Sequence, residues 1–188
     1  MEQLKKYLES RFSIGQEDWD IFSSKFVKRS FKRKDLILEK GQVEGFLSFI
    51  EEGQVRLFIP MEENDLTFSF VFKDSFVSAY DSFLQQSASG YSVQALSATT
   101  MWSIAYEDLQ EVYQHTSIGN LIGRKASEEL FLLKSKRELS LLNQTAEQRY
   151  LNLFHERPEV IKELPLKYIA SYIGVTPQAL SRIRKRIS

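Results

Sequence analysis

The spacing of apolar residues changes twice along the chain. Over residues 1–30 apolar side chains recur every three or four positions, as in amphipathic helices, and Gly15 separates two such segments. Over residues 31–106 apolar and polar positions alternate in short runs about 8–12 residues apart, which is typical of antiparallel strands. From Glu107 onward the helical spacing returns. The pattern predicts two short helices, then an antiparallel β-roll or sandwich, then a helical C-terminal region.

The long apolar stripe over residues 118–142 predicts a helix of about 37 Å. Such a helix is longer than a small roll needs to cover its core. It either covers that core or pairs with the same helix of a second chain, and we predict the pairing, in the manner of a coiled coil. The residues assigned to this homodimer interface are Ile118, Leu121, Ile122, Ala126, Leu130 and Leu133.

Two signals mark the start and end of the next helix. Thr145 with Gln148 three residues later resembles a capping box, which predicts a helix beginning at Thr145. Pro158 ends it, because proline cannot continue the interior of a helix.

The segment from Leu166 to Ile187 has the pattern of a helix-turn-helix. Ala170 is the small residue that lets two helices touch, and Gly174, four residues later, allows the positive φ angle of the turn. Thr176 is a good N-cap, and Pro177 suits the first position of the second helix. The apolar residues that hold one helix across the other are Ile169, Ile173, Val175, Leu180 and Ile183.

The second helix of this pair has two different faces. At 100° per residue, Leu180, Ile183 and Ile187 cluster on one side, and polar residues cluster on the other. Arginine, glutamine and serine on that outward face suit the edges of bases in a major groove, and flanking arginines suit phosphates. The residues predicted to contact DNA are Lys167, Thr176, Gln178, Ser181, Arg182, Arg184, Lys185 and Arg186.

Composition excludes several classes of protein. Zero cysteines exclude disulfides, iron–sulfur clusters and thiol catalysis. Two distant histidines, His115 and His155, make a metal site improbable, and without a phosphate-binding loop or nucleophile motif we predict no enzyme and no cofactor. No apolar run reaches membrane-spanning length and the N-terminus is charged, so we expect a cytoplasmic protein without membrane contact.

The formal net charge of zero conceals two oppositely charged halves. Residues 1–117 contain 12 Lys+Arg and 18 Asp+Glu, whereas residues 118–188 contain 13 and 7. The last 23 residues contain five Lys or Arg and no Asp or Glu. The excess positive charge therefore coincides with the predicted helix-turn-helix, where DNA would bind.

A phenylalanine-rich roll, a long helix and a terminal helix-turn-helix together resemble the CRP/FNR superfamily of bacterial transcription regulators. The resemblance rests on Gly41, the strand Phe46–Ile50 with the following Glu52–Val55, the stretch Phe76–Ala95, and Leu166–Arg186. It implies an α+β chain: a sensory β-roll domain like a cyclic-nucleotide-binding jelly roll with flanking helices (1–117), a dimerisation helix (118–142) and a helix-turn-helix, winged in the family, for double-stranded DNA (143–188). It also implies a homodimer on a palindromic operator, with RNA polymerase as a candidate partner.

The sensory region departs from the nucleotide-binding members of that family. These carry a Gly-Glu pair and an Arg-Ser pair, where this chain aligns Ser78-Ala79 and Ser89-Gly90. No Lys or Arg lies between Lys73 and Arg124, so a buried phosphate would lack a cation. We predict no cyclic-nucleotide binding, and either no effector or a small uncharged or apolar one. The candidate pocket residues are Phe70, Phe72, Phe76, Tyr80, Phe83 and Tyr91, although alternating aromatics also suit a plain core.

Three further expectations concern the end of the chain and the alternatives. Only about seven residues separate Pro158 from Leu166, and Ser188 ends the sequence, so we expect the wing to be reduced or missing. Pro177 cannot hydrogen-bond a base, so the operator is expected to differ from familiar ones.

Two alternatives remain: a degenerate roll that serves as a ligand-binding or interaction module without DNA binding, and a cupin-like metalloenzyme. The absence of histidine from residues 31–106 argues against the enzyme.

Overall fold

Two helices precede the first strand in the computed structural model, which describes residues 1–187. They are α1 (Glu2–Phe12) and α2 (Gln16–Ser24), and β1 follows at once (Phe26–Phe31). The predicted helical region is therefore wrong for residues 26–30. Phe26 still packs on Phe22, with the ring centroids 6.1 Å apart. The apolar spacing correctly indicated that Phe26 is packed, but it did not show that Phe26 lies in a strand rather than in a helix.

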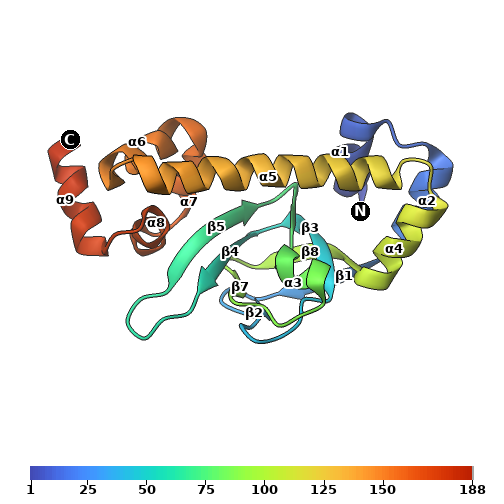
Figure 1. Cartoon of the computed structure of the whole chain (residues 1–188), viewed down its shortest axis with the longest axis horizontal. Helices are drawn as coiled ribbons and strands as arrows, with labels where there is room; N and C mark the ends of the chain where they lie inside the picture. Colours follow the sequence, from blue (N-terminus) through green and yellow to red (C-terminus); the bar gives the residue numbers. More distant parts are fainter. Residues whose placement is uncertain (188) are drawn as a thin grey trace. The chain divides into compact units, whose positions relative to one another are not determined.

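The strands form two four-stranded sheets, which confirms the predicted β-roll (Figure 1). The first has the order β1-β8-β3-β6, with β3 at Phe46–Glu52, β6 at Ser75–Val77 and β8 at Thr99–Ala105. The second has the order β2-β7-β4-β5, with β2 at Leu36–Leu38, β7 at Ser92–Ala95, β4 at Gln54–Ile59 and β5 at Leu66–Phe72. The pairs β1–β8, β3–β8, β3–β6 and β2–β7 are antiparallel.

The first sheet buries side chains on both of its faces. Phe49 pairs with Phe76 and Trp102 in register, so these three lie on one face. That face packs against α1, where the ring of Tyr7 lies 5.4 Å from that of Phe49. Ile50, the next residue, is fully buried on the opposite face. The sheet therefore separates a helix-facing core from the interior of the roll.

Seven helices follow or interrupt the strands of the described residues. The short α3 (Tyr80–Gln85) lies within the roll sequence, and α4 (Tyr106–His115) and α5 (Gly119–Asn143) follow it, as predicted for the long helix. The remaining helices are α6 (Ala146–Glu156), α7 (Pro158–Glu163), α8 (Leu166–Ile173) and α9 (Pro177–Ile187).

The predicted boundaries of α6 are confirmed. The amide of Gln148 donates to Oγ1 of Thr145 at 3.2 Å, and the Thr145 amide donates to Oε1 of Gln148 at 2.8 Å. Pro158 lies beyond the end of α6 and also occupies the first turn of α7, where its missing N–H has no cost. Within residues 1–187 no strand follows Ala105. None of the helices described is long and apolar enough to cross a membrane.

The chain divides into two compact units. The first comprises residues 1–57 and 70–128, which hold the sheets, α1 to α4 and the start of α5. The second comprises residues 58–69 and 129–188, so the end of the β4–β5 hairpin belongs with the C-terminal helices. Helix α5 contributes to both units.

Replacing Gly53 by alanine is expected to destabilise the first unit strongly. Gly53 has φ +91°, and an added Cβ would lie 2.5 Å from the carbonyl oxygen of Ala98 and 2.5 Å from Oγ1 of Thr99. The left-handed strain and the clash together should lower the free energy of unfolding by about 3 kcal/mol, measured by urea denaturation. Gly45→Ala is the control, because its Cβ would meet nothing within 4 Å. Equal losses in the two variants would contradict this account.

Candidate nucleic-acid interface

Helices α8 and α9 form the predicted helix-turn-helix. Ala170 is fully buried where the two helices meet. The turn begins at Gly174, which has φ 80° and ψ 36°, the left-handed conformation that favours glycine. The amide of Val175 donates to the carbonyl of Ala170 at 2.9 Å and closes the end of α8. The structure thus confirms the predicted roles of Ala170 and Gly174 in the turn between α8 and α9.

Helix α9 begins with the predicted cap and is held by two buried residues. Oγ1 of Thr176 accepts a hydrogen bond from the amide of Ala179 at 3.2 Å, and Pro177 follows the cap. Leu180 and Ile183 are buried, whereas Ile187 keeps 37% of its surface exposed. The apolar face of α9 is therefore confirmed over its first two turns and is weaker at its end.

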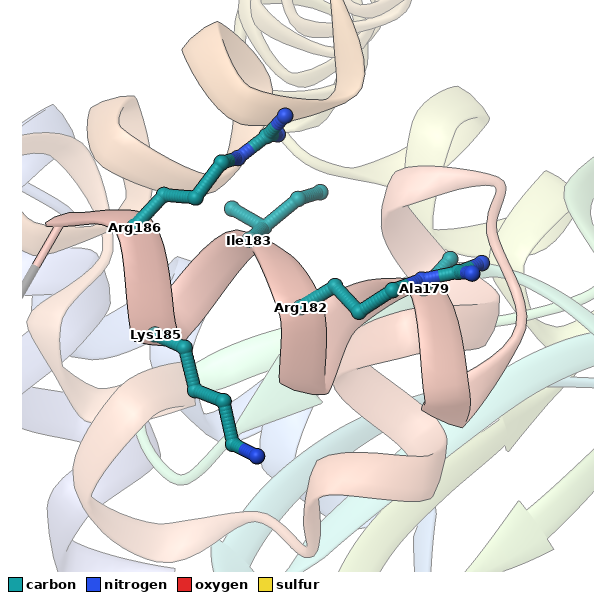
Figure 2. A pocket seen from close by; sticks show the side chains of 5 residues that line it. All are labelled: Ala179, Arg182, Ile183, Lys185 and Arg186. Atoms are coloured by element: carbon teal, nitrogen blue, oxygen red, sulfur yellow. The ribbon is translucent and has the colours of Figure 1, made fainter.

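The opposite side of α9 is polar, exposed and free of acidic residues. All eight residues predicted to contact DNA are exposed: Lys167, Thr176, Gln178, Ser181, Arg182, Arg184, Lys185 and Arg186. Arg182 and Lys185 line a shallow hollow together with Ala179, Ile183 and Arg186. In Figure 2 the side chain of Lys185 extends away from that of Arg186, so the two positive charges lie on different sides of α9.

The side chain of Arg186 turns toward a neighbouring helix. Its guanidinium lies 2.7 Å from a carboxylate oxygen of Glu147 on α6. Both side chains remain partly exposed, so the pair contributes little to stability. Its effect is to hold the Arg186 charge beside α6 rather than on the outward face of Arg182 and Lys185.

One contact of α8, the first helix of the helix-turn-helix, was not predicted from the sequence. Oγ of Ser171 donates to the carbonyl of Asp65 at 2.6 Å and accepts a hydrogen bond from the amide of Thr67 at 2.7 Å. Both partners lie on the β4–β5 hairpin, more than a hundred residues earlier in the chain. No local sequence signal could have shown this contact, since it depends on how distant segments fold together.

Comparison with known proteins matches both parts of this architecture. Residues 28–116 match the family described as cyclic nucleotide-binding domain. A CooA variant from Carboxydothermus hydrogenoformans has 14% identity, a TM-score of 0.73, and coverage of 96% of this chain and 83% of that one. FixK2 from Bradyrhizobium japonicum has 13% identity, a TM-score of 0.72, and coverage of 86% and 84%. A CRP/FNR-family protein from Eubacterium rectale has 16% identity, a TM-score of 0.66, and coverage of 97% and 87%.

The chain has the CRP/FNR fold. The match extends over nearly the whole chain and includes the helix-turn-helix, so the resemblance noted from the sequence is confirmed at the level of the fold. Among curated proteins none matches this sequence.

By the sequence alignment above, Ser78-Ala79 and Ser89-Gly90 occupy the positions that hold the nucleotide in this domain family. The carboxylate of Glu44 lies beside Ala79 and interacts electrostatically with the guanidinium of Arg29. The buried carboxylate of Glu44 accepts hydrogen bonds from the amides of Phe46 at 3.0 Å and Ala79 at 3.3 Å. Burial raises the pKa of Glu44, partly offset by these amides. Ser78 donates to the carbonyl of Phe46 at 2.9 Å, and the buried Ser89 donates to that of Tyr91 at 2.8 Å. Each hydroxyl is therefore engaged by the chain itself.

The six candidate pocket residues do not gather in one place. Phe76, Tyr80 and Phe83 belong to the helix-facing core, because Phe76 is in register with Phe49 and Phe83 packs on Tyr106 at 5.3 Å. This placement differs from a pocket inside the roll, since helices cover that face of the sheet. Tyr91 donates to Asp81 at 2.5 Å. The other two candidates, on β5, are the buried Phe70 and the half-buried Phe72.

The predicted interface residues of α5 fall into two groups, one packed within the chain and the other exposed or half-buried. Ile122 is buried in the core of the first unit and Ile118 packs against that core, so the intrachain packing already uses them. Leu121 and Leu133 are 40% and 56% exposed, Ala126 is exposed, and Leu130 is half-buried. The four most exposed apolar side chains of α5 all lie outside the predicted set; they are Phe131, Leu132, Leu139 and Leu142.

The two histidines lie apart on exposed helix positions. His115 contacts the carbonyl of Glu111 through Nδ1 at 2.8 Å, and His155 is exposed on α6. Among residues 1–187 no group of three or more His, Asp or Glu side chains is placed to hold a metal ion.

Proposed function

We propose that the protein is a DNA-binding transcription regulator of the CRP/FNR type. The observation that carries this proposal is the exposed, acid-free outward face of α9 within a folded helix-turn-helix. Solved structures of the same fold include a catabolite activator protein from Thermus thermophilus and a c-di-GMP responsive global regulator from Xanthomonas campestris, which supports a regulatory role. A role in binding rather than catalysis, in the cytoplasm where the DNA lies, follows from this proposal.

In this proposal α9 enters the major groove with its outward face. Arg182 suits a guanine and Gln178 suits an adenine, while Ser181 bonds a base or a phosphate. Lys185 and Arg184 neutralise phosphates, as does Lys167 at the start of α8. Two copies of the chain then read the two halves of a palindromic operator about one helical turn apart, and RNA polymerase remains a candidate partner on that DNA.

The homodimer is proposed to form along α5. Leu121, Leu132, Leu139 and Leu142 are exposed and, at 100° per residue, lie within about 80° of one another on the helix. We name these four residues the leucine edge of α5. Burying large apolar side chains stabilises a complex by about 1.5–3 kcal/mol each, which gives the edge a strong tendency to be covered. A second copy of α5 is the partner that a palindromic operator requires.

Arg182→Ala is expected to weaken binding to the operator by about 1–3 kcal/mol and to relax specificity at one base. The operator is first selected from a random pool of duplexes with the wild-type protein. Binding is then measured by fluorescence anisotropy at several salt concentrations. Lys162→Ala is the control, since Lys162 is an exposed lysine on a different helix, α7.

Three results would count against this DNA-binding proposal. The wild-type protein could select no sequence, its binding could be insensitive to salt, or Arg182→Ala could bind as tightly as the Lys162→Ala control. Failure to select any sequence would favour the alternative of an interaction module without DNA binding.

The double substitution Leu132→Glu with Leu139→Glu is expected to give a monomer. Two carboxylates on the leucine edge would repel their counterparts and lose the apolar burial. Binding to a two-site operator should fall about a hundredfold, because each half-site must then be bound independently. Analytical ultracentrifugation gives the mass, and Ser127→Glu is the control on another side of the helix. A dimer that persists in the double variant would place the interface elsewhere.

Cyclic AMP and cyclic GMP at millimolar concentration are expected to leave the melting temperature unchanged within about 1 °C. A ligand present at a hundred times its Kd would add about 2.7 kcal/mol to the free energy of unfolding. Residues 74–123 contain no Lys or Arg to neutralise a phosphate, and the charge of Arg29 already interacts with the Glu44 carboxylate. Differential scanning calorimetry makes the measurement, and a rise of several degrees would refute the absence of nucleotide binding.

A further inference from the structure

Two arginines from other helices donate to the last carbonyl groups of α8. The guanidinium of Arg137, on α5, donates from an Nη atom to the carbonyl of Tyr172. The Nε of Arg149, on α6, donates to the carbonyl of Ile173 at 2.9 Å. All four residues belong to the second compact unit. These carbonyls lie immediately before the turn at Gly174, which leads into α9.

Arg137 is held in place by more than this hydrogen bond. Its guanidinium carbon lies 4.0 Å from the centre of the Tyr172 ring, so the cation stacks on the side chain of the same residue. Burial lowers the pKa of Arg137, while Tyr172 raises it. The Nε atom is buried and has no hydrogen-bond partner among the described residues. A half-buried guanidinium that leaves its buried Nε without a partner, yet bonds and stacks on Tyr172, indicates that the contact with α8 has a role in positioning that helix.

Arg149 completes the arrangement from a second direction. One of its Nη atoms donates to the carbonyl of Gln144 at 2.5 Å, between α5 and α6, while its Nε atom bonds α8. Its other Nη atom lies 3.7 Å from the position that a Cβ on Gly174 would take. The C-terminal end of a helix carries partial negative charge, so two cations are favourable there. The end of α8 is thus fixed by α5 and α6 together.

We propose that Arg137 and Arg149 act as a clamp on the C-terminal end of α8, and that Arg137 is a positioning residue for DNA binding. The clamp defines where the turn begins and therefore the position of α9 relative to α5. This rests on the proposed function, in which α5 joins the two copies and α9 reads the operator. The distance between the two recognition helices is then set through Arg137. Because this distance is fixed, the protein should strictly prefer one spacing between the operator half-sites.

The first experiment measures hydrogen exchange of the protein without DNA. Arg137→Lys keeps the positive charge but loses the planar fork and the stacking. Exchange of the backbone amides over residues 166–176 should become about tenfold faster, since these amides are exposed when the end of α8 opens. Arg149→Lys should produce a similar increase. Arg124→Lys is the matched control, because Arg124 lies on the same helix, is 61% exposed and forms an ion pair with Glu128 four residues away. Circular dichroism confirms that each variant keeps its helices.

The second experiment measures the spacing preference on DNA. The operator selected with the wild-type protein is altered by inserting or deleting one base pair between its half-sites. The wild type should bind the altered operators at least tenfold more weakly than the original. Arg137→Lys should reduce this ratio to about two or three while remaining a dimer, and Arg124→Lys should keep the wild-type ratio. A merely destabilised protein would lose affinity for all three operators equally.

The two experiments fail in distinguishable ways. Wild-type exchange over residues 166–176 in Arg137→Lys would overturn the clamp whatever the DNA result. Faster exchange with an unchanged spacing ratio would overturn the positioning role. A wild-type protein that selects no DNA sequence would overturn the proposed function, and with it the positioning role, whereas the clamp itself is still decided by exchange.

Discussion

Helix α9 is strongly basic, and a small apolar contact holds it against the rest of the C-terminal unit. Helix α9 buries Leu180 and Ile183, while most of its remaining side chains are exposed and several carry positive charge. Like charges on one helix repel, and the apolar surface that α8 offers to Leu180 and Ile183 helps to offset that repulsion. That surface exists because Ala170 is small and Gly174 adopts the left-handed conformation. Anything that fixes the end of α8, such as Arg137, Arg149 or Ser171, therefore also fixes α9.

The roll shows how one sheet can serve two cores. Alternation along β3 sends Phe49 toward α1 and Ile50 into the roll, and both are fully buried. The helix-facing core uses Phe76 and Phe83, which explains why aromatic residues in alternating positions need not line a ligand site. Within the same unit the buried carboxylate of Glu44 accepts hydrogen bonds from the backbone amides of Phe46 and Ala79. The chain thus keeps the architecture of a cyclic nucleotide-binding domain while its own side chains satisfy these groups.

Features with a local cause could be predicted from the sequence. The capping box at Thr145, the turn at Gly174 and the cap at Thr176 each involve residues within a few positions, and each is confirmed. Apolar spacing found most strands for the same reason. It failed at Phe26, because a side chain packed on a helix has the same partner whether its own backbone is helical or extended. The bonds of Ser171 to the β4–β5 hairpin, and of Arg137 to α8, could not be predicted, because they join segments that are distant in sequence.

The separation of charge along the chain links these observations. A polyanion attracts a protein through local potential rather than through the total, and exposed charges act over only about 8 Å at physiological salt. Residues 166–187 place five cations within two short helices and contain no Asp or Glu. The pairing of Arg186 with Glu147 removes one cation from the outward face and places it beside α6. In the proposed complex with DNA, the affinity and its dependence on salt should therefore rest on the cations that remain outward, Arg182 and Lys185 foremost.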